Sequence, residues 1–263
     1  MSATTGQRKT RLTRHEDTIK AVLLAGGLGT RLRSVVASTA KPLAAVGERP
    51  FIELLVRQLQ HQGIRRLVMC TGYLAQEVEN ELGDGRKWDV TIEYSRESQA
   101  MGTAGAVKLA EPLLSDGSDF LVMNGDSFIE VNFQELIQFH REKNGIASLA
   151  VVRMKNTQRY GTVQMTTEGH VSGFKEKSDG DPTEFINAGI YVFNRRILDY
   201  IPDGTISLER DIFPSVLDQG IYALEQHGVF IDIGTPEDYA RAQKLYGQLY
   251  EAAYRKQPAD DSA

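Results

Sequence analysis

The chain has 263 residues and carries 30 Lys and Arg against 35 Asp and Glu, a formal net charge of −5. This length fits one large α/β domain or two small ones, and a hydrophobic content of 41% can supply a sizeable core. The acidic balance argues against a protein that coats nucleic acid, because such a protein needs a basic face. No apolar run approaches the roughly 18 residues that a membrane span needs. The single cysteine, Cys70, excludes an internal disulfide and is typical of a reducing cytoplasm.

Both ends of the chain have the composition of solvated tails. Residues 1–18 are polar and basic, and no apolar run follows them as it would in a secretory signal. A nucleic-acid-binding arm is the alternative for this segment. Residues 251–263 finish in the polar run KQPADDSA. We therefore expect one folded domain over 19–250, with no nucleic-acid partner and no membrane partner.

Residues 19–145 alternate apolar strands with amphipathic helices. Strands are expected at 19–25, 67–71, 90–95 and 120–123, and helices at 51–62, 74–82, 104–109 and 133–143. Short, continuously apolar strands are typical of a sheet that is buried on both faces. This alternation predicts an α/β fold with a doubly wound, mostly parallel sheet.

Residues 146–250 follow a different pattern. Strand-like runs are found at 146–154, 162–165, 170–175 and 186–193. Their short connections favour antiparallel pairing. A helix is expected at 207–217, a strand at 230–233, and a last helix from Pro236, capped by Thr235, to about Tyr250. We therefore expect a single domain with a mixed sheet.

A glycine-rich loop, Leu24-Ala25-Gly26-Gly27-Leu28-Gly29-Thr30-Arg31-Leu32, directly follows the first expected strand. Glycines let a backbone turn sharply and bring its N–H groups close to a phosphate. The dinucleotide fingerprint G-x-G-x-x-G fails here because Leu32 occupies its third glycine position, and the chain has no Gly-Lys pair for a Walker A loop. A tight turn alone would explain the glycines but not the arginine that follows them.

Seven further motifs follow this loop in order. They are Lys41-Pro42-Leu43, Met101-Gly102-Thr103-Ala104-Gly105-Ala106, Asn124-Gly125-Asp126, Tyr160-Gly161-Thr162-Val163, Phe174-Lys175-Glu176-Lys177, Ile186-Asn187-Ala188-Gly189-Ile190-Tyr191 and Phe230-Ile231-Asp232-Ile233-Gly234-Thr235-Pro236. The ordered set resembles the sugar-1-phosphate nucleotidylyltransferases, also called NDP-sugar pyrophosphorylases, over residues 19–246. The resemblance implies a Rossmann-like nucleotidyltransferase fold with a nucleotide-binding half at 19–145 and a sugar-phosphate half at 146–250.

The chain departs from the family pattern at three places. The run Arg33-Ser34-Val35-Val36 stands where Pro-Leu-Thr is common, Ala40 replaces the proline before Lys41, and Ser178 replaces the proline after the Glu-Lys pair. The Arg-Ser-Val and Phe-Ile-Asp-Ile-Gly-x-Pro-Glu-Asp-Tyr variants are most similar to the D-glycero-D-manno-heptose 1-phosphate guanylyltransferases.

The resemblance implies transfer of a nucleotidyl group from an NTP to a sugar 1-phosphate, which gives an NDP-sugar and pyrophosphate. The attacking phosphate oxygen is already anionic near pH 7, because a phosphomonoester loses its second proton near a pKa of ~6. A protein base is therefore not required. Charge neutralisation and alignment are required instead.

The family's site residues can be carried over to matching positions. Arg31 would offer a bidentate fork to the triphosphate, Lys41 a second cation, and Lys177 a cation for the sugar 1-phosphate. The expected nucleotide-binding residues are Leu24, Ala25, Gly26, Gly27, Gly29, Thr30, Glu97, Gly102 and Thr103. The expected sugar-phosphate-binding residues are Gly161, Lys175, Glu176, Lys177 and Asn187.

Two aspartates, Asp126 and Asp232, each follow an expected hydrophobic strand. The carboxyl ends of strands converge on the ligand crevice in doubly wound sheets. Two carboxylates can hold one Mg²⁺, with water and phosphate oxygens completing its octahedron. The family match therefore implies Mg²⁺ as cofactor, and the alternative for each aspartate is a turn or cap.

Glu97 bears on the choice of base, since thymidylyl- and uridylyltransferases of this family tend to carry Gln here. A carboxylate only accepts hydrogen bonds, so it complements the N1–H and N2–H₂ donors of guanine and would repel a pyrimidine carbonyl. The alternative for Glu97 is a solvated glutamate in the run Ser95-Arg96-Glu97-Ser98. On the first interpretation we expect GTP and a sugar 1-phosphate as partners of a cytoplasmic enzyme, with homo-oligomer formation left open. The alternatives are a mannose-1-phosphate guanylyltransferase, a uridylyl- or thymidylyltransferase, and an inactive subunit that binds a nucleotide sugar.

Overall fold

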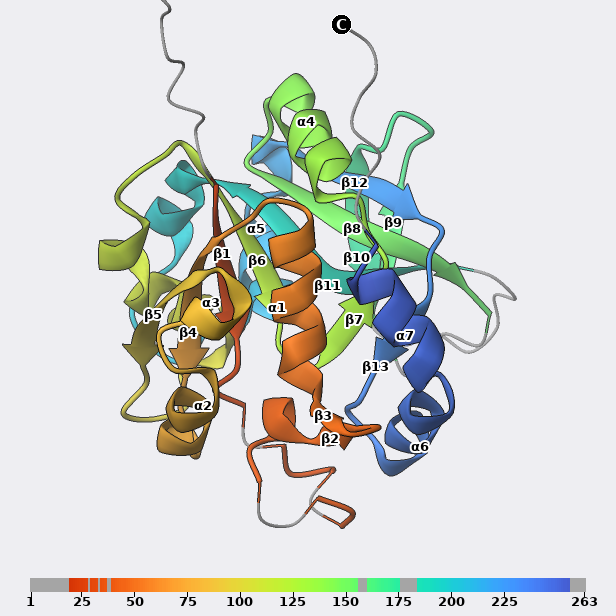
Figure 1. Ribbon diagram of the computed structural model, residues 1–263. Helices are drawn as coiled ribbons and strands as arrows, with labels where there is room; N and C mark the ends of the chain where they lie inside the picture. The colour runs from red at the N-terminus through yellow and green to blue at the C-terminus, as the bar shows by residue number, and fades with distance from the viewer. Residues whose placement is uncertain are drawn as a thin grey trace, which may run out of the picture.

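The computed structural model describes residues 19–27, 29–32, 34–36, 39–155, 160–175 and 184–255. Within these residues a nine-stranded mixed sheet forms the centre of the molecule, with helices on both of its faces (Figure 1). This arrangement confirms the predicted fold class. The N-terminal segment 1–18 lies outside the described residues.

The parallel half of the sheet is built around β1 (Lys20–Leu24). Its neighbours are β4 (Arg66–Thr71) and β6 (Asp119–Asn124), and β5 (Thr91–Arg96) pairs with β4. The connections contain α1 (Phe51–His61), α2 (Ala75–Leu82), α3 (Gly102–Leu109) and 3₁₀ turns at Arg86–Trp88 and Glu111–Leu114. Because these four strands run the same way, the loops that follow them meet at one edge of the sheet, which we call the carboxyl edge.

The antiparallel half is organised by the long strand β11 (Glu184–Asn194). Its last residues pair with β6, while its other edge pairs with β8 (Ala147–Met154), which follows α4 (Phe133–Lys143). The first residues of β11 pair with β9 (Thr162–Met165), and β9 pairs with β10 (Val171–Lys175). The expected antiparallel pairing is therefore confirmed. One further strand, β12 (Ile221–Gln226), was not predicted and runs parallel to β8.

Short pairs of strands lie outside the main sheet. The strand β7 (Ser127–Ile129) pairs antiparallel with β13 (Phe230–Asp232), and β2 (Ala45–Val46) pairs with β3 (Arg49–Pro50). A 3₁₀ turn at Lys41–Leu43 precedes β2. The expected strand at 230–233 is thus present, whereas its partner β7 was missed because three residues carry too little pattern to read.

Two predicted helices are wrong in detail. In place of one helix at 207–217 the chain forms a π-helical turn at Leu208–Ile212, α5 (Phe213–Ser215) and a 3₁₀ turn at Leu217–Gln219. Pro214 has no N–H to donate and so disrupts a regular helix here. In place of one helix at 236–250 there are two, α6 (Pro236–Lys244) and α7 (Tyr246–Ala253).

The predicted start of the C-terminal tail at residue 251 is wrong, because the last helix extends beyond it. The helix α7 continues through Ala252 and Ala253, which are 5% and 0% exposed. These small side chains belong to the hydrophobic cluster that also contains α1, so the burial of apolar surface holds them in the fold. Residues 256–263 lie outside the described part of the chain.

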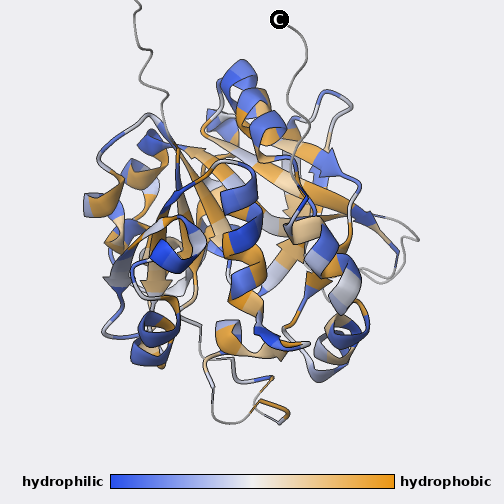
Figure 2. Cartoon of the chain, viewed as in Figure 1, coloured by the Kyte–Doolittle hydropathy of each residue, from blue (hydrophilic) through white to orange (hydrophobic). Residues whose placement is uncertain are grey.

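The core consists of two hydrophobic clusters, one on each face of the sheet. Successive side chains of β1 point to opposite faces of the sheet, so Ala21 and Leu23 belong to one cluster and Val22 to the other. Helices α1, α2, α4 and α7 contribute to the first cluster, and α3 and α5 to the second. Figure 2 shows the apolar strands inside and the polar outer faces of the helices. Within the described residues no helix has the length and apolar character needed to cross a bilayer.

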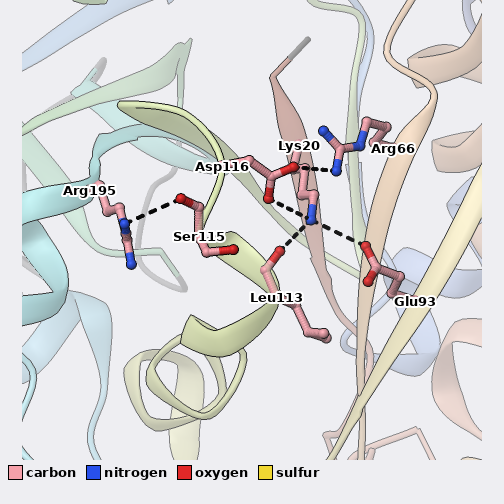
Figure 3. A network of polar contacts seen from close by, with 7 residues as sticks. All are labelled: Lys20, Arg66, Glu93, Leu113, Ser115, Asp116 and Arg195. Atoms are coloured by element: carbon pink, nitrogen blue, oxygen red, sulfur yellow. Dashed lines mark hydrogen bonds and ion pairs between the residues drawn. The ribbon is translucent and has the colours of Figure 1, made fainter. Parts of the chain in front are cut away.

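A charged network lies around the first residue of β1, at the end of the strand away from the carboxyl edge. Lys20 is 5% exposed, and its Nζ lies 3.2 Å from Glu93 Oε2, 3.1 Å from Asp116 Oδ1 and 2.5 Å from the carbonyl oxygen of Leu113 (Figure 3). Arg66 also pairs with Asp116. A buried ammonium is tolerated when it is paired and hydrogen-bonded, and here the pairs join β1 to β5 and to the turn before β6.

Candidate functional site

Three loops at the carboxyl edge of the sheet contact one another at Gly26. A Cβ built on Gly72 would lie 2.9 Å from the carbonyl oxygen of Gly26, and one built on Gly26 would lie 2.3 Å from Glu97 Oε1. These two glycines therefore let the loops after β1, β4 and β5 touch. The contact brings Glu97 against the glycine loop, although the two are about 70 residues apart in sequence.

Glu97 has one carboxylate oxygen engaged and the other directed at the glycine loop. Its Oε2 accepts a hydrogen bond of 2.8 Å from the backbone N–H of Met101, while Oε1 occupies the space that a side chain on Gly26 would need. Partial burial raises the pKa of Glu97, and the Met101 hydrogen bond opposes this. At most one oxygen of this carboxylate is consequently open to a ligand at the loop.

The cations of the glycine-loop region differ in their surroundings. Arg31 is exposed in a turn anchored by the buried Leu32, and its guanidinium makes no ion pair within the described residues. Lys41 lies closer in, since a Cβ on Gly29 would meet the Lys41 side chain at 3.0 Å. The Lys41 ammonium forms an ion pair with Asp126. Lys41 thus connects the glycine loop to the first aspartate.

The two predicted aspartates are brought together by the pairing of β7 with β13. Asp126 directly precedes β7, and Asp232 lies opposite Ser127 in the register of the pair. The Ser127 hydroxyl lies 3.3 Å from Asp126 Oδ1 and 3.5 Å from Asp232 Oδ2. The backbone N–H of Gly234 donates to the other oxygen of Asp232. Two carboxylates from distant parts of the chain therefore share one hydroxyl.

The electrostatics of this pair favour a cation. Burial and then the neighbouring charge of Asp126 raise the pKa of Asp232 to about 6, while Lys41 acts in the opposite direction. Like charges held this close repel, and a bound cation would relieve that repulsion. Among the described residues, no group of three or more His, Cys, Asp or Glu side chains is arranged to hold a metal ion. Two hard carboxylate ligands fit Mg²⁺, which keeps several waters and takes other ligands from phosphate, so the donor set is compatible with this ion.

A cavity of about 680 Å³ opens beside the aspartates, and we call it the β11 cavity. It is lined by Asn124, Ser127, Tyr160, Gly161, Thr162, Phe174, Asn187, Gly189, Tyr191, Glu209, Arg210, Pro214, Phe230 and Asp232. Of the predicted site residues, Gly161, Asn187 and Asp232 are on this surface. Lys175 ends β10. Glu176 and Lys177 lie outside the described residues.

The irregular part of β11 shapes one wall of this cavity. The register with β8 shifts between Asn187 and Tyr191, and Gly189 in this stretch has φ +76°. Asn187 Nδ2 donates to Tyr191 Oη over 2.9 Å, and Asn187 Oδ1 accepts from the backbone N–H of Gly189. The bulge therefore fixes the Asn187 side chain at the cavity.

Sequence reasoning missed Glu209 and Arg210 among the lining residues. They belong to the run Ser207-Leu208-Glu209-Arg210-Asp211, whose charges gave no reason to expect anything except the first turn of a helix. Arg210 is the only cationic side chain among the described lining residues. Tyr160 and Phe174 had appeared only as parts of longer motifs.

Comparisons with known proteins place the chain in a family. The family model described as "Nucleotidyl transferase" matches residues 20–248. The chain belongs to this family. A mannose-1-phosphate guanylyltransferase of Mycobacterium tuberculosis is 36% identical over 228 residues, which are 85% of this chain and 63% of that protein. Mannose-1-phosphate guanylyltransferase 1 of Arabidopsis thaliana is 36% identical over 246 residues, which are 92% and 67%. The chain thus spans about two thirds of the length of these curated relatives.

Solved structures of nucleotidyl transferase fold also match. The crystal structure of HddC from Yersinia pseudotuberculosis complexed with GMP-PN has a TM-score of 0.77 and 30% identity, and the match covers 87% of this chain and 99% of HddC. A Bacillus anthracis structure in complex with sucrose has a TM-score of 0.78 over 92% of this chain and 98% of that one. At 23% identity, this second likeness shows the fold alone.

Proposed function

We propose that the protein transfers a guanylyl group from GTP to a sugar 1-phosphate, giving a GDP-sugar and pyrophosphate. The observation that carries the proposal is the position of Lys41, Asp126 and Asp232 between the glycine loop and the β11 cavity. A triphosphate over the loop and a sugar phosphate in the cavity would meet beside these three groups. Residues 19–145 would then hold the nucleotide and residues 146–250 the sugar phosphate.

In this proposal the chain supplies charge and alignment. The sugar phosphate attacks the α-phosphorus in line, its oxygen forms the new P–O bond, and the bond to pyrophosphate breaks. Arg31 and Lys41 would neutralise the triphosphate, and N–H groups of the glycine loop would donate to its oxygens. Lys177 and Arg210 are the proposed cations for the sugar phosphate. No residue needs to remove a proton, because the attacking oxygen is already anionic near neutral pH.

Asp126 and Asp232 are the proposed holders of Mg²⁺. The bound ion would offset charge that develops on the departing pyrophosphate. The Ser127 hydroxyl lies within reach of both carboxylates and can donate its one proton to either of them. Lys41 pairs with Asp126 and lies against Gly29, so its ammonium is close to both the proposed metal site and the glycine loop.

Guanine is proposed as the base on two grounds. The open oxygen of Glu97 can accept from the N1–H and N2–H₂ groups of guanine but cannot donate to a pyrimidine carbonyl. The relatives at 36% identity are named guanylyltransferases. The family's uridylyl- and thymidylyltransferases are the alternative, and the Glu97 carboxylate disfavours them.

For the sugar we propose D-glycero-D-manno-heptose 1-phosphate, on the similarity of the Arg33-Ser34-Val35 and Phe230–Tyr239 motifs to the heptose guanylyltransferases. Mannose 1-phosphate is the second candidate, because both curated relatives are named for that substrate. The β11 cavity combines apolar surfaces such as Tyr160 and Phe230 with hydrogen-bonding groups such as Asn187, as a sugar requires. The proposed enzyme works in the cytoplasm.

An inactive subunit that binds a nucleotide sugar is the candidate of a different class. Such a subunit would have no need for the cations and carboxylates of the transfer step. Arg31, Lys41, Asp126 and Asp232 are all present, and three of them lie together. The retained set therefore favours an active enzyme.

The decisive experiment measures pyrophosphate release with four NTPs against heptose 1-phosphate, mannose 1-phosphate and glucose 1-phosphate, with Mg²⁺ and with EDTA. We expect turnover with GTP, highest with heptose 1-phosphate and abolished by EDTA. Turnover that is highest with mannose 1-phosphate would make mannose 1-phosphate the proposed substrate in place of heptose 1-phosphate. Turnover with UTP or dTTP alone would refute the guanine proposal, and binding of GDP-mannose without turnover of any pair would favour the regulatory subunit.

A further inference from the structure

Glu209 is held by three hydroxyl groups that come from three different places. Its Oε1 accepts a hydrogen bond of 3.0 Å from Tyr191 Oη on β11. Its Oε2 accepts from Thr103 Oγ1 at the start of α3 and from Ser207 Oγ, each over 2.9 Å. Tyr191 is fully buried, and burial together with the Glu209 charge raises its pKa well above the ordinary value. The phenol consequently remains a donor to this carboxylate.

The segment that carries Glu209 is also bonded along its backbone to the segment that starts α3. Ile206 N donates to the Met101 carbonyl oxygen over 2.8 Å, Ala104 N donates to the Ile206 carbonyl oxygen over 2.9 Å, and Leu208 N donates to Thr103 Oγ1 over 2.8 Å. A Cβ on Gly102 would lie only 2.4 Å from the Ile206 carbonyl oxygen. Residues 100–105 and 205–209 therefore form one close-packed unit.

This unit joins the two halves of the site. At one end, Met101 N donates to Glu97 beside the glycine loop. At the other end, Glu209 bonds Tyr191, and Tyr191 accepts from Asn187 in the β11 cavity. A continuous series of hydrogen bonds thus runs from the proposed base-binding carboxylate to a proposed sugar ligand. Glu209 is the member that bonds both α3 and β11.

We infer that Glu209 is a positioning residue that fixes the nucleotide half of the site relative to the sugar half. The inference rests on the proposed function, because only a reaction between two separately bound substrates needs the halves aligned. An error of about 1 Å in the placement of reacting groups can cost about 100-fold in rate. The neutral and isosteric change Glu209→Gln keeps an acceptor for Tyr191 but places an amide donor against Thr103 and Ser207, so it should loosen the α3 side of the link.

A direct role in holding the sugar is the competing explanation, since Glu209 also lines the β11 cavity. A sugar ligand lost by mutation should raise KM for the sugar 1-phosphate. A positioning residue should instead lower kcat and leave both KM values nearly unchanged, because each half still binds its own substrate. The two explanations therefore predict different kinetic constants.

The experiment compares the wild type with Glu209→Gln, Tyr191→Phe and the double variant, using the pair of substrates that the wild type turns over best. We expect kcat to fall about 10- to 100-fold in each single variant. Both KM values should stay within about threefold in Glu209→Gln, whereas Tyr191→Phe also removes the acceptor of Asn187 and should raise KM for the sugar 1-phosphate as well. The double variant should lose little more than the worse single one, because both changes break the same link. Thermal unfolding of all variants checks that they fold, and Tyr191→Phe tests the link from its other end if Glu209→Gln does not fold.

Ser207→Ala is the matched control. It removes a hydroxyl that donates to the same Glu209 oxygen, but Thr103 on α3 and Tyr191 on β11 still donate to the carboxylate, so kcat should remain within about threefold of the wild type. The Ser207 hydroxyl also accepts from the backbone N–H of Arg210, so kcat and not KM is the readout for this control. A rise in KM for the sugar phosphate with normal kcat, or additive losses in the double variant, would overturn the inference. A wild type that turns over no substrate pair means that the proposed function itself has failed, and the inference then falls with it. An active wild type with fully active Glu209→Gln overturns the inference alone.

Discussion

Asp232 lies opposite Ser127 in the β7–β13 pair, and this register places its carboxylate beside that of Asp126. The backbone N–H of Ile233 also donates to the Asp126 carbonyl oxygen over 2.9 Å, which holds the two strands in this register. The backbone pairing therefore sets the positions from which the two carboxylate side chains extend. A substitution that removes a charge can therefore be made without changing the backbone pairing.

The first prediction removes one charge at a time from this pair. Asp126→Asn and Asp232→Asn should each lower kcat at least about 100-fold, because a charge-stabilising group at the reacting phosphates is lost. Both variants should fold, since the amide keeps the shape of the side chain and the backbone register is unchanged. Asp218→Asn on the surface serves as control and should have wild-type kcat. Pyrophosphate release and thermal unfolding, measured together, check this, and near-normal kcat in either variant would remove that aspartate from the proposed metal site.

The second prediction concerns the base. Glu97→Gln should lower the preference for GTP over UTP about 10- to 100-fold, measured as the ratio of kcat/KM values. The amide oxygen of Gln can still accept from Met101, so only the open oxygen of Glu97 is exchanged for a donor. A donor at that place repels the guanine N–H groups and suits a pyrimidine carbonyl. An unchanged ratio would show that Glu97 does not read the base.

A third prediction follows from the charge of the β11 cavity. Arg210 is the only cation among its described lining residues, whereas Glu209 and Asp232 are acidic, and a sugar phosphate is a dianion near neutral pH. Arg210→Met should therefore raise KM for the sugar 1-phosphate about 5- to 10-fold and leave KM for GTP unchanged. Arg65→Met, which removes an exposed arginine paired with Asp89 at the far end of β4, is the charge-matched control. Equal increases in KM in both variants would show that the effect comes from the net charge of the protein and not from the position of Arg210.

The sequence predicted the alternating strands and helices well because each of those elements carries a long apolar pattern of its own. It did not predict β7, which has only three residues, or β12, whose run Ile-Tyr-Ala-Leu-Glu-Gln follows irregular turns and pairs with β8 about 70 residues earlier in the chain. The same limit applies to the site. Residues in glycine-rich or aspartate motifs stood out, whereas Glu209 takes its place from contacts with Thr103 and Tyr191, which no local pattern encodes.

The fourth prediction concerns pH and stability. Burial lowers the pKa of His140, which is 2% exposed and lies 2.9 Å from Ser148 Oγ through Nδ1. Below a pH of about 6.5 the unfolded chain binds a proton here that the folded chain does not, so the free energy of unfolding should fall as the pH drops. His140→Gln should flatten this dependence. Urea unfolding of both proteins between pH 5 and 8 measures it, and parallel curves would contradict the assignment.

The fifth prediction separates backbone strain from the packing of the two segments joined in the site. Gly102 and Gly63 both have positive φ, +72° and +85°, but only at Gly102 would a Cβ meet a neighbour, the Ile206 carbonyl oxygen. Gly63→Ala should cost about 1–2 kcal/mol of stability, the strain of a left-handed residue, and leave kcat unchanged. Gly102→Ala should cost more than this and lower kcat, because residues 205–209 must move away from α3. Urea unfolding and pyrophosphate release measure both effects, and equal stability losses with normal kcat in both variants would show that the contact between the segments does not matter for transfer.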